Sequence, residues 1–150
     1  MTKYEMGQSP HTVTLVLSDD DYAMALKDEM SDAKPVNDKT ISYNGLQYMI
    51  VTGDRIIDSL PVMYPQNTDI KIPFVFTGKF TCYLDNGAQV SNLITRFAAE
   101  GLNPSFGEDN TVSLLAKGED IIIVLQNLKA YEDMPDVVCV KPEIITYLDD

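Results

Sequence analysis

The chain has 150 residues, which is enough for one hydrophobic core without a metal ion or a disulfide to stabilise it. Apolar residues make up 45% and charged residues 23%, which excludes an intrinsically disordered chain. The 23 acidic and 11 basic residues give a formal net charge of −12, which argues against direct binding to nucleic acid or to an anionic membrane.

The N-terminal residues and the cysteines predict a location inside the cell. Residues 1–10 contain no apolar run, and no segment approaches the roughly 20 apolar residues that a membrane helix needs. We interpret Cys82 and Cys139, the only two cysteines, as reduced thiols. We therefore predict a cytoplasmic protein, or one inside a particle assembled in the cytoplasm. We expect residues 1–10 to form an N-terminal arm and residues 11–150 to form a single domain.

The first predicted elements are a strand and a helix. Residues 11–17 are rich in β-branched side chains and follow a proline, which predicts a strand. Ser18 then suits an N-cap, with Asp21 completing a capping box and the aspartates 19–21 at the positive end of the helix dipole. Apolar residues at helical spacing continue to Met30, so we predict a helix that opens at residues 18–21 and is stopped by Lys34-Pro35.

Two β-hairpins are predicted next. Asn44-Gly45 is typical of a two-residue type I′ turn, because that turn needs positive φ at both central positions. This turn pairs Tyr43 with Leu46 and Ile41 with Tyr48, which places apolar side chains on one face. Alternating apolar residues between 70 and 84 predict a second hairpin that turns at Thr77-Gly78-Lys79.

The C-terminal half adds shorter elements. A helix capped by Asn86 ends at Gly101, and strands are predicted at residues 111–116 and 121–126. A strand at residues 137–140 and a helical turn at residues 142–148 complete the chain. We predict an α+β fold, a mainly antiparallel sheet with two helices on one face. A ferredoxin-like core with an inserted β-hairpin is the leading architecture.

Few residues point to catalysis or to a cofactor. His11 is the only histidine, and no nucleophile lies near it in the sequence, so we expect a surface or capping role. The aspartates 19–21 could bind Mg²⁺ or Ca²⁺, but helix capping is the favoured explanation for them. No phosphate-binding glycine loop and no Cys/His cluster is present, so we predict no cofactor and no metal.

Charge is unevenly distributed along the chain. Residues 100–150 hold eleven acidic and three basic residues, whereas residues 51–99 hold four of each. Acidic pairs in this last third are candidates for docking a basic protein surface. They are Glu108 and Asp109, Glu119 and Asp120, and Glu132 and Asp133.

An aromatic group in the neutral middle of the chain is the second candidate surface. If the hairpin at residues 70–84 extends from the sheet, its aromatic side chains form an apolar patch that needs a partner or another copy. These residues are Tyr64, Phe74, Phe76, Phe80 and Tyr83.

We therefore expect a non-enzymatic interaction or assembly protein that self-associates through the aromatic hairpin, in keeping with a viral or mobile-element accessory subunit. One alternative is an acidic inhibitor that binds the basic site of a nucleic-acid-binding protein. The other is a small-molecule-binding domain or small enzyme with a cleft near Asp54, Arg55 and Arg96.

Overall fold

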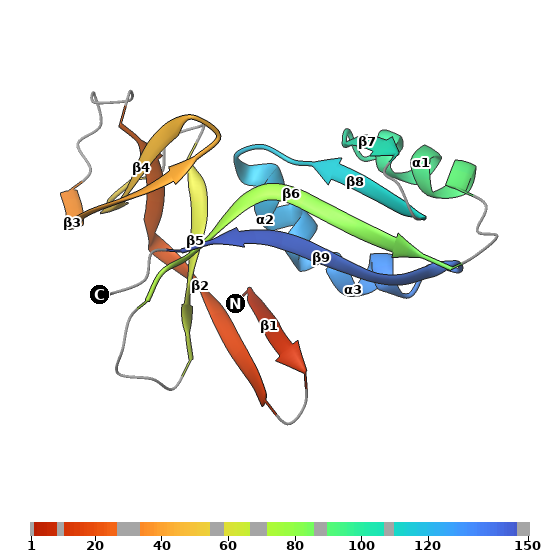
Figure 1. The fold of residues 1–150 in the computed structure, drawn as a ribbon, viewed down its shortest axis with the longest axis horizontal. Coiled ribbons are helices and arrows are strands. Elements are labelled where there is room, and N and C mark those ends of the chain that lie inside the picture. The colour runs from red at the N-terminus through yellow and green to blue at the C-terminus, as the bar shows by residue number, and fades with distance from the viewer. Residues whose placement is uncertain are drawn as a thin grey trace. The chain divides into compact units, whose positions relative to one another are not determined.

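The chain separates into two compact units in the computed structural model (Figure 1). Unit 1 comprises residues 1–77 and 144–150, and unit 2 comprises residues 78–143. Strands β6 (Phe74–Leu84) and β9 (Val137–Ile145) contribute residues to both units. The structure describes residues 2–8, 11–26, 34–54, 59–66, 72–85, 90–106 and 110–146.

The described part of unit 1 is built from antiparallel strands. Its strands are β1 (Lys3–Gln8), β2 (His11–Ala25), β3 (Lys34–Tyr43), β4 (Leu46–Thr52), β5 (Leu60–Pro65) and the first residues of β6. They lie in the order β3-β4-β2-β5-β6, and β1 pairs with β2. Residues 3–8, expected as part of an arm, are therefore a paired strand whose Tyr4 ring packs edge-on against Phe76.

The Asn44-Gly45 hairpin is confirmed, with its register. Tyr43 pairs with Leu46 and Ile41 with Tyr48, and the two turn residues have φ of 54° and 80°. Both values lie in the left-handed region that the type I′ turn requires and that glycine adopts without a steric cost.

The helix predicted to run from Ser18 to a stop at Lys34-Pro35 is wrong, because β2 continues to Ala25 and β3 begins at Lys34. Ser18 does bind the amide that a helix cap would bind: the Asp21 N–H donates to Ser18 Oγ at 2.9 Å. This bond lies where the pairing of β2 with β5 shifts register, between Leu17 and Tyr22. A short polar side chain can stabilise a bulge as well as a helix start, so the capping pattern did not identify the element. Residues 27–33 lie outside the described part.

Unit 2 places helices against one face of an antiparallel sheet. Its further elements are α1 (Val90–Ala99), β7 (Asn103–Phe106), β8 (Thr111–Leu115), α2 (Glu119–Gln126) and α3 (Leu128–Glu132). The strands lie in the order β9-β6-β8-β7. Phe80 and Cys82 of β6 and Leu114 of β8 are buried, whereas Tyr83 and Leu115 are exposed. The first group therefore faces the helices.

The predicted hairpin at residues 70–84 is wrong, because β6 runs through Thr77-Gly78-Lys79 without turning. Gly78 has φ of 97°, and a Cβ there would lie 2.1 Å from the carbonyl oxygen of Ala116. The Ala116 N–H donates to the Gly78 carbonyl at 2.8 Å. Glycine is thus needed for close backbone approach within a strand and not for a hairpin turn. Residues 70 and 71 lie outside the described part.

The strand predicted at residues 121–126 is wrong, because these residues lie in helix α2. Ile121, Val124 and Leu125 are buried, at the i, i+3 and i+4 spacing of one helix face, while Ile123 is 51% exposed. A continuous apolar run has no period that separates a strand from a helix.

The C-terminal helical turn is also wrong over residues 142–145, because β9 continues to Ile145. β9 pairs with β6 alone among the described strands, and an edge strand tolerates Pro142, which has no N–H to donate. Residues 147 and 148 lie outside the described part.

The α+β class and the mainly antiparallel sheet are confirmed. The predicted helix at residues 86–101 corresponds to α1, although its expected cap, Asn86, lies outside the described residues. The strand at 111–116 corresponds to β8, and the strand at 137–140 to the start of β9. Three helices, not two, are found among the described residues. A ferredoxin-like core is not confirmed, and it stays a prediction.

Candidate functional site

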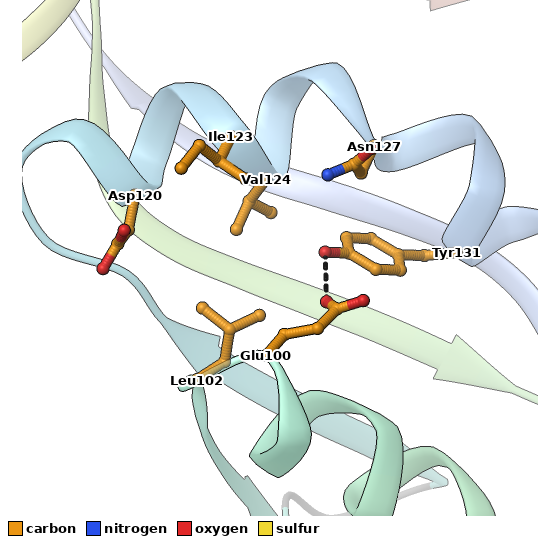
Figure 2. Close-up of a pocket in the computed structure, with 7 residues that line it drawn as sticks. All are labelled: Glu100, Leu102, Asp120, Ile123, Val124, Asn127 and Tyr131. Atoms are coloured by element: carbon orange, nitrogen blue, oxygen red, sulfur yellow. Dashed lines mark hydrogen bonds between the residues drawn. The ribbon is translucent and has the colours of Figure 1, made fainter.

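A pocket in unit 2 lies between helices α2 and α3 on one side and the segment joining α1 to β7 on the other (Figure 2). Its volume is about 310 Å³, near the lower end of the range of about 300–1,000 Å³ found for small-ligand pockets. The residues that line it are Glu100, Leu102, Asp120, Ile123, Val124, Asn127 and Tyr131.

Helical spacing brings most of these residues to the same side. Asp120 and Val124 of α2, Asn127 at the junction of α2 with α3, and Tyr131 of α3 follow one another at intervals of four, three and four residues. Side chains at such intervals lie one above another on a helix face. The opposite wall comes from Glu100 and Leu102, which follow directly after α1.

The walls of the pocket are apolar, and the carboxylates lie at its edge. Leu102, Val124 and Tyr131 are buried, whereas the side chain of Ile123 is half exposed. Asp120 is exposed, and 37% of the Glu100 side chain is accessible. A ligand in this pocket would therefore meet hydrocarbon on the buried walls and negative charge where the lining is exposed.

Glu100 is held by two neighbours. The Tyr131 hydroxyl donates to Glu100 Oε2 at 2.7 Å, and Arg96 Nε lies 3.4 Å from Glu100 Oε1. The Arg96 guanidinium carbon lies 5.5 Å from the centre of the Tyr131 ring, within the range of a cation–π contact. Phe97 packs edge-on against the same ring, with 5.1 Å between centroids. Both oxygens of Glu100 are thus engaged inside the chain.

Tyr131 remains a hydrogen-bond donor because it is buried. Burial raises the pKa of Tyr131 well above its usual range, and the hydrogen bond to Glu100 and its negative charge raise it further. The charge of Arg96 and a hydrogen bond with Asn127 lower the pKa of Tyr131, but by less. The hydroxyl therefore stays protonated near neutral pH and supports the carboxylate rather than serving as a base.

Asp120 is the available charge of the pocket. No described residue bonds to its carboxylate, and Figure 2 shows Asp120 at one end of the pocket lining, apart from Glu100 and Tyr131. Asp120 also lies in the first turn of α2, where a carboxylate is favourable beside the helix dipole. The pocket thus combines a carboxylate without a partner among the described residues, one engaged carboxylate and apolar walls, an arrangement suited to an organic cation.

The aromatic residues predicted as an interface are distributed differently from expectation. Phe76 and Phe80 are fully buried, so they are core residues and cannot form an exposed patch. Tyr64 and Phe74 are half-buried, and the Tyr64 hydroxyl donates to Asp21 Oδ2 at 2.6 Å. Tyr83 is 41% exposed and remains a candidate.

The acidic pairs also differ from one another. Asp120 lines the pocket, whereas Glu119 is exposed beside it and does not. Glu132 accepts a 3.3 Å hydrogen bond from the Val140 N–H, which gives it a structural role at strand β9. Asp133 is exposed at the end of α3. Glu108 and Asp109 lie outside the described residues.

The remaining predicted site residues do not form a site that the structure describes. Asp54 belongs to unit 1 and Arg96 to unit 2, and Arg55 lies outside the described residues, as does the side chain of His11. The aspartates at 19–21 lie within strand β2, where its pairing with β5 shifts register, and not at a helix start. In the described part of the chain, no group of three or more His, Cys, Asp or Glu side chains is arranged to hold a metal ion.

Two further findings concern helix length and similarity to known proteins. None of the helices within the described ranges is long and apolar enough to span a membrane. Comparison of the chain with protein families, with curated proteins and with solved structures found no match.

Proposed function

We propose that this protein is a non-enzymatic interaction protein that binds a positively charged segment of a partner protein on the pocket side of unit 2. The observation that carries the proposal is the exposed carboxylate of Asp120, which no residue of the described ranges bonds, in the lining of an apolar-walled pocket. The net charge of −12 favours encounter with a basic surface over long distances.

Exposed apolar area beside the charge supports a protein partner. Ile123 is 51% exposed next to Asp120, and a charged group beside an exposed aliphatic side chain suits contact with a segment that is both basic and apolar. Basic protein segments present such side chains, because lysine and arginine carry their charge on aliphatic stems.

The test uses a labelled ten-residue lysine peptide as the probe and fluorescence anisotropy as the measurement. We expect the affinity to fall as salt rises, and Asp120→Asn to weaken binding about three- to fivefold. Glu119→Gln is the matched control, because it removes one negative charge from the same helix turn without altering the pocket. Equal losses in the two variants, or no binding at low salt, would overturn the proposal.

Self-association is a second candidate, favoured by the exposed face of the unit 2 sheet. Tyr83 of β6 is 41% exposed and Leu115 of β8 is 48% exposed. In the pairing of these strands, Lys79 lies opposite Leu115 and Tyr83 opposite Thr111, so Tyr83 and Leu115 share one sheet face. Light scattering of the wild type and of a Tyr83→Ser, Leu115→Ser double variant tests this. An unchanged mass at all concentrations would exclude it.

A further inference from the structure

The pocket has the dimensions and the lining of a site for one long side chain. Its volume of about 310 Å³ is small, and its apolar walls are Leu102, Ile123 and Val124. An unbranched aliphatic stem can lie along such walls while its polar end stays near water. The wall residues therefore select for the hydrocarbon character of what enters.

The charge at the opening selects a cation. Glu100 pairs with Arg96 through one carboxylate oxygen and accepts the Tyr131 hydroxyl on the other, so both of its oxygens already have a partner within the chain. Asp120 has no such partner among the described residues. One carboxylate is consequently available in the described part of the chain, and it is exposed at one end of the lining, on the same helix as Ile123 and Val124 (Figure 2).

We infer that the pocket takes a single lysine or arginine side chain of the partner, with its stem against Leu102, Ile123 and Val124 and its cationic head on Asp120. This inference rests on the proposed function and specifies its anchor. In this arrangement Arg96 limits the affinity for the cationic side chain, because it pairs with Glu100, the second carboxylate of the pocket.

Blocked single residues are suitable probes because they separate the stem from the charge. N-acetyl-lysine methylamide and N-acetyl-arginine methylamide carry both, N-acetyl-norleucine methylamide carries the stem alone, and methylammonium chloride carries the charge alone. Each probe is titrated into the ¹⁵N-labelled full chain and followed by the amide shifts of Ile123, Asn127 and Tyr131. The lysine and arginine probes show which head group binds more tightly.

We expect saturable shifts at these three residues with the lysine or arginine probe at millimolar concentration. Norleucine and methylammonium should bind at least about tenfold more weakly, since each lacks one half of the interaction. Asp120→Asn should remove the saturation, and Glu119→Gln should preserve it. Norleucine binding as tightly as lysine, or shifts spread evenly over acidic residues, would overturn the inference.

The affinity of the Arg96→Gln variant for the lysine probe distinguishes the role given to Arg96 from a purely structural one. Removing the guanidinium frees Glu100 Oε1 near the pocket, so the affinity for the lysine probe should rise about threefold. A loss of affinity in Arg96→Gln, with the fold intact by the dispersion of amide shifts, would contradict the role given to Arg96.

Failure of this inference can be distinguished from failure of the proposed function. If the lysine peptide binds and depends on Asp120 while no single-residue probe shifts the pocket, the partner contact stands and the anchor is overturned. If the single-residue probes saturate the pocket while the peptide does not bind, the anchor stands and the protein-partner function is overturned.

Discussion

The hydroxyl of Tyr131 donates a 2.7 Å hydrogen bond to Oε2 of Glu100, a residue 31 positions earlier in the chain. This bond joins α3 to the turn after α1, and both groups lie at the pocket. Tyr131 is 1% exposed, so its hydroxyl must find its partner within the protein. The contact that shapes one wall of the pocket thus also connects the two helical segments.

Replacing Tyr131 with phenylalanine should therefore lower stability. Tyr131→Phe keeps the ring contacts with Phe97 and Arg96 but removes the donor to Glu100. The expected loss is about 1–2 kcal/mol in the free energy of unfolding, measured by urea denaturation at pH 7. Tyr83→Phe, at an exposed tyrosine, should change stability by less than about 0.5 kcal/mol. Equal changes in the two variants would show that the hydrogen bond contributes nothing.

Gly78 and Gly45 allow a comparison of two glycines that both have positive φ. A Cβ on Gly78 would lie 2.1 Å from the Ala116 carbonyl oxygen, whereas a Cβ on Gly45 would meet nothing within 4 Å. Gly45→Ala should cost about 1 kcal/mol from backbone strain alone. Gly78→Ala should cost about 2 kcal/mol more, because the chain must also move away from Ala116. Thermal and urea unfolding of the two variants measure the difference.

The sequence allowed the class of the fold and one hairpin to be predicted, but not every element. The Asn44-Gly45 turn was predictable because its backbone geometry depends on those two residues alone. The helix at residues 121–125 was not predictable, since five consecutive apolar side chains fit a buried strand as well as a helix. The acidic residues Glu119 and Asp120 were an available signal, because carboxylates are frequent in the first turn of a helix.

Because residues 121–126 were predicted as a strand, most of the pocket could not be predicted from the sequence. Asp120 was predicted as a docking residue, but Val124, Asn127 and Tyr131 share its side only when the segment is helical. With α2 recognised as a helix, the spacing of these residues would have predicted that they share one face. Glu100 comes to Tyr131 by packing between segments distant in the chain, and no local pattern specifies that approach.

Ser18 should stabilise the bulge of strand β2 through its side chain. Its Oγ accepts the Asp21 N–H at 2.9 Å, in a half-buried part of unit 1. Ser18→Ala should cost about 1 kcal/mol in urea unfolding, and Ser18→Thr should restore most of it because threonine keeps the acceptor. The helical signal in circular dichroism should be the same for all three proteins. A loss of helical signal in Ser18→Ala would contradict the strand assignment.

Cys82 should be much less reactive than Cys139 in the folded protein. Both thiols are free, and Cys82 is fully buried on β6 whereas Cys139 is half-buried on β9. Burial, with a smaller effect of Cys139, raises the pKa of Cys82 from 9.0 to about 12. Because the thiolate is the reactive form, a disulfide reagent at pH 8 should modify Cys139 first, and Cys82 only after unfolding. Rapid modification of a Cys139→Ser variant under native conditions would contradict this.

The raised pKa of Cys82 also predicts how stability depends on alkaline pH. The unfolded thiol loses its proton near the ordinary cysteine pKa of 9.0, whereas the folded thiol keeps it to about 12. Between these values the folded state binds more protons, so this group's contribution is complete below pH 9 and falls as pH rises toward 12. Urea unfolding between about pH 8 and pH 10.5 should show a smaller decline in a Cys82→Ala variant than in the wild type. Parallel pH profiles for the two proteins would mean that the thiol ionises equally readily in the folded and unfolded chain.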